Sequence, residues 1–221
     1  SVYLSEEHTG IGWDGIILIE PSTVADAKMR IFNRDGSEGK MCGNGIRCVG
    51  KYLYDNGKTQ KTELTIETLS GIKQLKLYVR GGTVKSVTVD MGRAELRPEK
   101  IPVLLPGEKI VSRPVQIDEK TYNITCVSMG NPHCVLFCDY PDLMEIGKIG
   151  PAIETAPIFP DRVNVEFVQV LDGHTLKMRV WERGSGETLA CGTGACAAVV
   201  AATENGFCKK GEDITVRLRG G

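Results

Sequence analysis

The chain reads Lys28-Met-Arg-Ile-Phe-Asn-Arg34 near its start and Lys177-Met-Arg-Val-Trp-Glu-Arg183 at an offset of 149 residues. At the same offset Cys42 matches Cys191, and the glycines that follow each cysteine match as well. The two copies align over 30 positions without a gap, and ten of these positions are identical, which chance rarely gives. The period is far too long for a solenoid, so the repeat predicts two related domains.

Both copies predict the same local structure. An apolar strand comes first, Met29–Phe32 in one copy and Met178–Trp181 in the other. A polar loop with glycine and a Cys-Gly-x-Gly turn follow, and a helix begins near Gly43 or Gly192. An Asn-Gly pair, a natural left-handed stop, then ends each helix.

Short β-patterned runs separated by turn residues make up most of the remaining chain. They are Leu64–Glu67, Leu75–Val79, Val84–Val89, Val115–Ile117, Ile124–Val127, Val135–Phe137, Val163–Val170 and Ile214–Leu218. The pattern predicts an α+β fold of two pseudo-symmetric domains from an internal duplication, each a mainly antiparallel sheet wrapped around a principal helix. We place the domains at residues 1–95 and 96–221, with the linker in the Pro-rich stretch Glu95–Pro114.

The repeat also bears on the two ends of the chain. Asn131 lies 33 residues before Asn164, and Asn164 matches Gly15, so a partner of Asn131 in the first copy would precede Ser1. The second copy stops at Gly221, earlier than the first. We therefore expect the first domain to lack its opening strand here and the second domain to lack its last strands. A targeting peptide upstream of Ser1 cannot be judged from this sequence.

Composition and charge narrow the class of protein. The chain of 221 residues is 41% hydrophobic and 25% charged, with a formal net charge of −1, as in ordinary globular enzymes. Neither a nucleic-acid nor a membrane partner is expected from such a charge pattern. The eight cysteines lack the Cys-x2-Cys spacing of structural zinc sites, and the chain is long for a disulfide framework. Reduced thiols fit best.

The position of Cys42 and Cys191 before a helix predicts their chemistry. Backbone N–H groups at a helix start lack intrahelical partners, lower the pKa of a nearby thiol and can hold a carboxylate. Two such motifs, one in each domain, predict a cleft with a thiol on each wall. That arrangement suits a two-base proton transfer at one carbon, without pyridoxal phosphate or metal. The alternative for each motif alone is a tight turn with a buried cysteine.

Longer motifs resemble a known family. The stretches Phe32–Glu38 and Met41–Cys48 resemble the first active-site signature of diaminopimelate epimerases, and Glu182–Cys196 resembles the second. Further similar blocks are Thr9–Gly15, Met129–His133 and Arg162–Asn164. The resemblance covers essentially the whole chain in the right order.

The resemblance implies an isomerase that interconverts LL- and meso-diaminopimelate in the cytoplasm, for lysine and peptidoglycan biosynthesis, with no cofactor. By motif, Cys42 and Cys191 are the catalytic acid/base pair. The reacting carboxylate would be held by backbone N–H groups of Gly43, Asn44, Gly192 and Thr193. The distal amino-acid group would be bound by Asn33, Asn131, Asn164, Glu182 and Arg183. A homodimer is compatible with this assignment.

Other interpretations stay open at this point. Asn33 and Asn131 are also typical turn residues, and Glu182 with Arg183 could be a solvated pair. His133 could support the site from behind it, and the six other cysteines fit structural positions. Many relatives carry Gln where this chain has Gly15, and the family's N-terminal His-Gly-Leu-Gly-Asn block is not in this sequence. The alternatives are a proline racemase-like enzyme, an amino-acid racemase for another substrate with a charged tail, a redox protein and a non-catalytic binding domain.

Overall fold

The structure is a computed structural model that describes Tyr3, residues 15–33 and residues 35–221. The motif residues Thr9–Asp14 and Arg34 lie outside these described residues. The chain divides into two compact units, Ser1–Gly92 and Arg93–Gly221, so the division falls three residues before the expected one at residue 95. Within the described residues no helix is long and apolar enough to cross a membrane.

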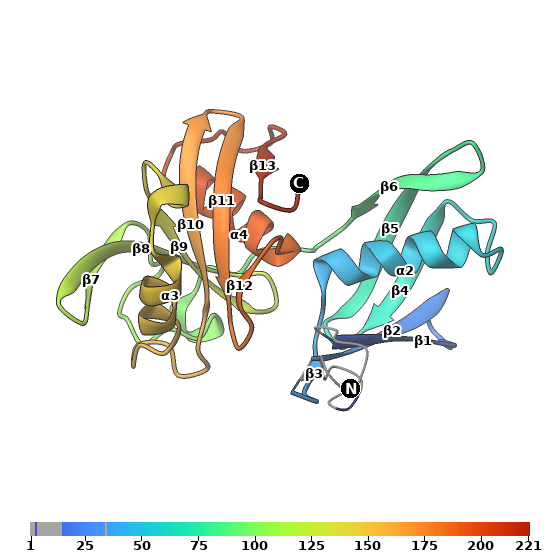
Figure 1. Ribbon diagram of the computed structural model, residues 1–221, viewed down its shortest axis with the longest axis horizontal. Coiled ribbons are helices and arrows are strands. Elements are labelled where there is room, and N and C mark those ends of the chain that lie inside the picture. The colour runs from blue at the N-terminus through green and yellow to red at the C-terminus, as the bar shows by residue number, and fades with distance from the viewer. Residues whose placement is uncertain (1–2, 4–14, 34) are drawn as a thin grey trace. The chain divides into compact units, whose positions relative to one another are not determined.

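The first unit is a six-stranded sheet with helix α2 along one face (Figure 1). Its elements are β1 (Gly15–Glu20), β2 (Ala27–Asn33), β3 (Glu38–Gly39), α2 (Gly43–Asp55), β4 (Glu63–Thr68), β5 (Gly71–Arg80) and β6 (Thr83–Val89). The strand order is β1-β2-β4-β5-β6, and β3 pairs with β2. Strands β2 and β4 are parallel, whereas the other described pairs are antiparallel.

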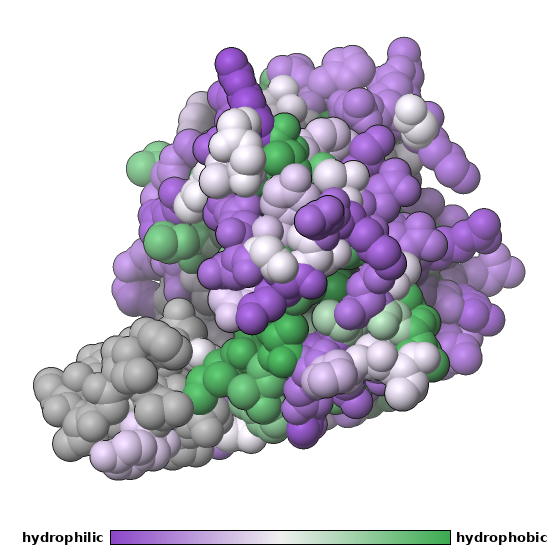
Figure 2. All heavy atoms as spheres, turned by 90° about the vertical axis from the view of Figure 1, so that its right-hand side faces the viewer, coloured by the Kyte–Doolittle hydropathy of each residue, from purple (hydrophilic) through white to green (hydrophobic). Residues whose placement is uncertain are grey.

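The core of the first unit follows from the alternation of strand residues. Leu75 and Leu77 on β5 are buried, and they belong to one core with Ile46 and Val49 of α2. Side chains of a strand point alternately to opposite faces, so Tyr78 lies on the other face and is exposed. In the view of Figure 2, hydrophobic side chains form a stretch within a mostly hydrophilic surface.

The second unit is a seven-stranded sheet with helices on both faces. Its elements are η1 (Pro98–Lys100), β7 (Arg113–Ile117), β8 (Lys120–Ser128), β9 (Pro132–Phe137), η2 (Pro141–Leu143), α3 (Ile146–Glu154), β10 (Asn164–Asp172), β11 (Thr175–Glu182), β12 (Gly186–Thr188), α4 (Gly192–Glu204) and β13 (Thr215–Arg217). The strand order is β12-β11-β10-β9-β8-β7, and β13 pairs with β11. The pairs β9–β10 and β11–β13 are parallel.

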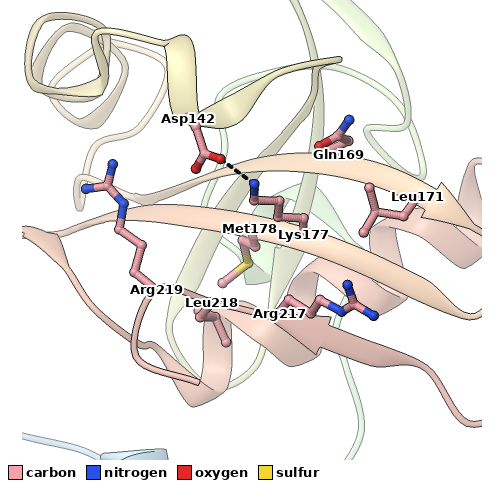
Figure 3. A pocket seen from close by; sticks show the side chains of 8 residues that line it. All are labelled: Asp142, Gln169, Leu171, Lys177, Met178, Arg217, Leu218 and Arg219. Atoms are coloured by element: carbon pink, nitrogen blue, oxygen red, sulfur yellow. Dashed lines mark hydrogen bonds and ion pairs between the residues drawn. The ribbon is translucent and has the colours of Figure 1, made fainter.

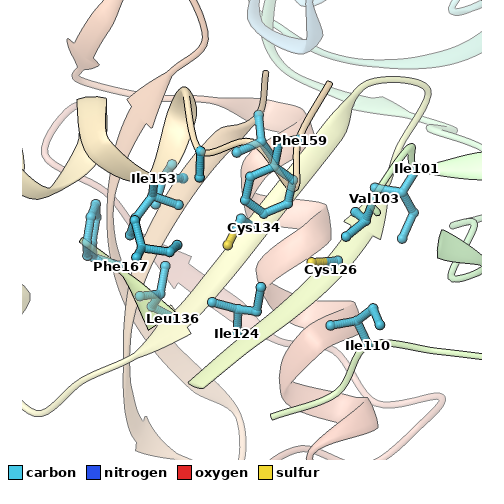
Figure 4. Close-up of a cluster of buried hydrophobic side chains, with 14 of the residues drawn as sticks. Ile101, Val103, Ile110, Ile124, Cys126, Cys134, Leu136, Ile153, Phe159 and Phe167 are labelled. Atoms are coloured by element: carbon cyan, nitrogen blue, oxygen red, sulfur yellow. The ribbon is translucent and has the colours of Figure 1, made fainter. Parts of the chain in front are cut away.

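The two faces of this sheet have different roles. One face carries the main hydrophobic core, which includes Ile124, Cys134 and Phe167 together with Ile153 of α3 (Figure 4). The other face contacts α4, in which Ala197, Ala198, Ala201 and Ala202 are fully buried and let the helix lie close to β8, β9, β10 and β11. The alternation of side chains therefore turns polar residues of β9 and β10 toward the start of α4, where the second cysteine motif lies.

The structure confirms the duplication at the level of register and ion pairs. Strand β1 pairs with β2 as Ile16 opposite Phe32, and β10 pairs with β11 as Val165 opposite Trp181, the same register at the 149-residue offset. Arg30 binds Glu38 in the first unit with Nε and Oε1 2.7 Å apart. At the same offset, the Nε of Arg179 lies 2.8 Å from the Oε1 of Glu187. Each ion pair links a long strand, β2 or β11, to the short strand that follows it, β3 or β12, just before the cysteine.

The expected linker Glu95–Pro114 is wrong, because this stretch is part of the second unit. Glu95 exchanges two backbone hydrogen bonds of 2.9 Å with Ser128. Further along the stretch, Ile101, Val103 and Ile110 are buried in the core. These three buried side chains anchor the stretch to the second unit, although most of its other residues are partly or fully exposed.

Candidate active site

Both predicted cysteines are the N-cap residues of a helix. Cys42 precedes α2 with φ −136° and ψ 112°, and Cys191 precedes α4 with φ −131° and ψ 112°. The sulfur of Cys42 accepts a hydrogen bond from the N–H of Gly45 at 3.3 Å, and that of Cys191 accepts one from Gly194 at 3.4 Å. The expected helix starts at Gly43 and Gly192 are thus confirmed, and each thiol replaces the usual Ser or Asp cap.

Two glycines leave the space that lets each sulfur lie close to the helix backbone. A Cβ on Gly45 would lie 2.5 Å from the Cδ1 of Ile17 and 3.3 Å from the sulfur of Cys42. A Cβ on Gly194 would lie 2.8 Å from the Oε1 of Glu166 and 3.3 Å from the sulfur of Cys191. The second glycine of each Cys-Gly-x-Gly motif is therefore required for space, not for an unusual backbone angle.

The start of each helix, with its first backbone N–H groups, lies beside the sulfur of the cap cysteine. Gly43 and Asn44 open α2, and Gly192 and Thr193 open α4, so both motifs present backbone donors at the positive end of a helix dipole. In the first unit the side chain of Arg47 also reaches this end and donates to the Oδ1 of Asn44 at 2.6 Å. Each motif can thus combine a sulfur with a carboxylate cradle.

The expectation of a lowered thiol pKa is wrong for Cys191. Burial, followed by the charges of Glu182 and Glu166, raises the pKa of this thiol well above its ordinary value. Hydrogen bonds from Thr193 and Gly194 act in the opposite direction without balancing the burial. The side chain is only 6% exposed, whereas Cys42 is partly exposed. Loss of solvation therefore outweighs the helix N-terminus at the second thiol.

A row of hydrogen-bonded polar side chains connects β10 and β9 with Cys191. The Oγ1 of Thr193 lies 3.4 Å from the sulfur of Cys191 and accepts from the Nδ2 of Asn131 at 3.2 Å. The Oδ1 of Asn131 lies 3.0 Å from the Nε2 of His133. The Nδ1 of His133 lies 2.7 Å from the Oε1 of Glu166, and both of these side chains are fully buried. Asn131 is thus part of a hydrogen-bond network and not only a turn residue.

Asn164 joins the ends of three segments. Its Nδ2 donates to the carbonyl of Pro132 at 2.8 Å, and its Oδ1 accepts from the backbone N–H of Arg183 at 2.9 Å. The guanidinium of Arg183 is exposed and donates to the carbonyl of Asp161. Glu182 is partly buried and accepts from the hydroxyl of Thr188. The charge of Glu182 contributes to the raised pKa of Cys191, so this carboxylate lies near the thiol.

Asn33 lies at the end of β2, where its side chain closes a turn. Its Nδ2 donates to the hydroxyl of Ser37 at 3.0 Å, and its backbone N–H bonds the carbonyl of Ser37 at 2.8 Å. Gly15 opens β1 directly opposite Asn33. A Cβ at Gly15 would lie 2.4 Å from the carbonyl oxygen of Phe32, which explains a glycine at this position without reference to a ligand.

Residues that the sequence analysis did not select complete the second site. The main residue of this kind is Glu166. The sequence could have indicated it, because Glu166 lies two residues after Asn164 and therefore shares a face of β10 with it. The parallel pairing of β10 with β9 places Asn164 opposite His133. Among the described residues no group of His, Cys, Asp and Glu forms a metal site, and all eight cysteines are free.

Surface cavities within each unit lie elsewhere. The second unit has a cavity of about 280 Å³ lined by Asp142, Met178 and the basic residues Lys177, Arg217 and Arg219 (Figure 3). Its one acidic group is neutralised, because Lys177 binds Asp142. None of the lining residues is a predicted site residue. The predicted site residues at the helix starts therefore lie outside this cavity.

Comparisons with known proteins define first a class and then a family. The chain shares its fold with a hydroxyproline epimerase from Agrobacterium vitis, with a TM-score of 0.74 and 20% identity over 100% of this chain and 67% of that one. The likeness shows the fold class, a duplicated α+β architecture of two sheet-dominated units. The family model described as diaminopimelate epimerase matches residues 3–97 and 125–221. The chain belongs to the diaminopimelate epimerase family, a family of isomerases.

Similarity to curated relatives over nearly the whole of this chain supports the same assignment. The chain is 56% identical to a diaminopimelate epimerase of Acetivibrio thermocellus over 99% of its own length and 77% of that protein. It is 52% identical to a diaminopimelate epimerase of Methanococcus maripaludis over 100% of its length and 79% of that protein. The expected family is therefore confirmed.

Proposed function

We propose that the protein interconverts LL- and meso-diaminopimelate by moving protons between its two cap thiols and the substrate α-carbon. One sulfur, as thiolate, takes the α-proton from one face of the carbon. The other, as thiol, gives its proton to the opposite face, so the carbon is inverted and the two cysteines exchange protonation states. The observation that carries the proposal is the pair of cysteine caps with equal backbone geometry in a member of this family.

The carbanion formed between these two steps needs stabilisation. Negative charge moves from the α-carbon into the carboxylate, and backbone N–H groups of Gly43, Asn44, Gly192 and Thr193 are proposed to receive that carboxylate. Such donors are fixed in place by the helices, so they cost little reorganisation during the reaction. Neither pyridoxal phosphate nor a metal is part of the proposal.

The raised pKa of Cys191 favours the thiol form of this residue in the free protein. This supports Cys191 as the acid of the first turnover, with Cys42 as the base toward the isomer that binds first. In the reverse direction the roles exchange, because each transfer leaves the two sulfurs in the opposite states.

The distal end of diaminopimelate carries a carboxylate and an ammonium group, and opposite charges near the second site match them. The exposed guanidinium of Arg183 is proposed to bind the carboxylate, and Glu182 the ammonium. The amides of Asn33, Asn131 and Asn164 would complete this recognition. Asn131 and Asn164 are held by hydrogen bonds in the second unit, so their positions are fixed before substrate binds.

The proposed activity places the protein in lysine and peptidoglycan biosynthesis in the cytoplasm, with a small-molecule substrate and without nucleic acid or membrane as partner. Alanine variants test the assignment. Cys42→Ala and Cys191→Ala should each lose epimerisation by several orders of magnitude, because the reaction needs an acid and a base together. Cys48→Ala and Cys196→Ala are the matched controls on the same two helices and should keep most activity. Full turnover by Cys191→Ala would overturn the proposal.

A further inference from the structure

The turn that carries Glu182 and Arg183 is held by a buried side chain from another segment, Glu154 at the end of α3. One oxygen of Glu154, Oε2, accepts from the indole Nε1 of Trp181 at 2.7 Å. The other oxygen, Oε1, accepts from the backbone N–H of Gly184 at 3.0 Å. Trp181 directly precedes the two charged residues and Gly184 directly follows them, so Glu154 binds the turn on both sides of the pair.

The direction of these two hydrogen bonds is fixed by their donors. An indole N–H and a backbone N–H can only donate, so the side chain between them must provide two acceptor atoms. Glu154 is 6% exposed, and both of its oxygens meet a donor. A glutamine of the same shape has one acceptor oxygen, and its NH2 group would face the second donor. The turn therefore requires the chemistry of glutamate at this position and not only its size.

The backbone of the turn is ordered by further contacts. The N–H of Ser185 bonds the carbonyl of Glu182 at 3.0 Å, and Gly184 has a positive φ of 75°. The N–H of Arg183 is bound by the Oδ1 of Asn164 at 2.9 Å. Two consecutive N–H groups, those of Arg183 and Gly184, are thus held by side chains from two other segments of the unit.

The matching turn of the first unit is bound by one of its own residues. Asp35 stands 149 residues before Gly184, and its Oδ1 accepts from the N–H of Ser37 at 2.9 Å and from the Ser37 hydroxyl at 2.6 Å. The second unit has glycine in both places, Gly184 and Gly186, so it cannot form the same side-chain contacts. In the second unit the acceptor comes instead from Glu154, on a helix that packs against the turn.

We propose that Glu154 is a positioning residue for substrate selection, which holds the turn so that Glu182 and Arg183 face the charged distal end of diaminopimelate. The inference rests on the proposed function, in which these two residues bind that end. Glu154 does not touch the substrate in this proposal. It orders the backbone from which both charged side chains leave, so less freedom is lost when the substrate binds.

Glu154→Gln tests the proposal, because it keeps the shape of the side chain and removes one of the two acceptors. The KM for diaminopimelate should rise about tenfold while kcat stays within about twofold, since contacts to the distal end lie away from the reacting carbon and hold substrate and transition state alike. Alkylation of Cys42 and Cys191 by iodoacetamide should keep the parent rates. A merely structural role predicts the reverse, a lower kcat from loss of folded protein with an unchanged KM.

Glu145→Gln is the matched control at the other end of α3. Glu145 is largely exposed and pairs with Lys148, so this variant should keep the parent KM and kcat. Hydrogen exchange followed by NMR adds a readout that needs no turnover. The indole N–H of Trp181 and the N–H of Gly184 should be protected in the parent. At least one of them should exchange about tenfold faster or more in Glu154→Gln, and neither should change in Glu145→Gln.

A double-mutant cycle with Arg183→Ala identifies the route of the effect. Because Glu154 acts through the turn, adding Glu154→Gln to Arg183→Ala should raise KM by less than about threefold. An unchanged KM in Glu154→Gln, a full tenfold rise on top of Arg183→Ala, or fast exchange of both N–H groups in the parent would overturn the inference. A parent protein that does not epimerise diaminopimelate would refute the proposed function, whereas an active parent with a KM indifferent to Glu154→Gln would refute this inference alone.

Discussion

Replacing Gly194 with alanine tests how tightly the second thiol site is packed. The added Cβ would lie 2.8 Å from the Oε1 of Glu166 and 3.3 Å from the sulfur of Cys191. Glu166 is fully buried and bound to His133, so it cannot move aside without breaking that contact. Overpacking of this kind costs about 1–3 kcal/mol, and the better helix propensity of alanine returns at most about 1 kcal/mol. The net loss of unfolding free energy should be about 1–2 kcal/mol.

Urea unfolding followed by circular dichroism measures this loss, and epimerisation of diaminopimelate measures its effect on the site. Turnover should fall by at least about tenfold, because a small displacement of a reacting group is costly. Gly147→Ala in α3 is the matched control, since a Cβ there meets nothing within 4 Å, and it should be neutral or slightly stabilising. A Gly194→Ala protein with parental stability and parental turnover would refute the packing described for this site.

Three further predictions concern stability, cofactors and substrate choice. Arg179→Met should destabilise the protein by about 1–3 kcal/mol at neutral pH, because it removes a buried guanidinium that binds Glu187 and donates to the carbonyls of Pro141 and Met144. Arg179 lowers the pKa of Glu187, so the stabilisation by this ion pair is present above the ordinary pKa of 4.5 and is lost as pH falls below it. The difference in unfolding free energy between variant and parent, measured by urea unfolding, should therefore shrink below pH 4.5. Activity should survive chelators and hydroxylamine and be lost on thiol alkylation, so a stoichiometric metal needed for turnover would contradict the mechanism. Arg183→Ala should lower kcat/KM for diaminopimelate on the order of 30-fold or more, with alkylation of Cys42 and Cys191 unchanged, and an undiminished preference over lysine would contradict the role of Arg183.

Local chemistry made the two principal helices predictable from the sequence. Both begin at the glycine that directly follows a cysteine, and both end at an asparagine followed by a glycine with positive φ, 65° at Gly57 and 77° at Gly206. The repeat added a check that a lone motif lacks, because both copies have to adopt the same strand, turn and helix. The fold class followed from these features, and the register of the sheets agrees with them.

Helix α3 shows where sequence patterns fail. It contains Gly147, Gly150 and Pro151, residues that disfavour a helix interior, and the sequence analysis predicted no element there. Tertiary packing overrides this preference, since a Cβ at Gly150 would lie 2.4 Å from the Cγ of Trp181. The glycine that weakens the helix locally is what lets it lie against β11.

The environment of Cys191 could not be predicted for a similar reason. A helix start predicts a lowered thiol pKa, whereas burial and the approach of Glu166 depend on strand pairing between segments more than 20 residues apart. Glu166 carries no motif of its own. Only the folded structure shows that it contacts His133 and lies beside Gly194 at the start of α4. The two cysteines could therefore be identified from the sequence, whereas the burial of Cys191 and the approach of Glu166 could not.

The most direct test of the two-thiol mechanism follows hydrogen at the α-carbon of LL-diaminopimelate in deuterated water, early in the reaction. Two bases on opposite faces predict that the newly formed meso isomer carries deuterium at the inverted carbon, because its proton comes from a thiol that has exchanged with solvent. The remaining LL isomer should still carry hydrogen. A product that retains the original hydrogen, or an unreacted substrate that gains deuterium as fast as product forms, would point to a single base and contradict the assignment of Cys42 and Cys191 as a pair.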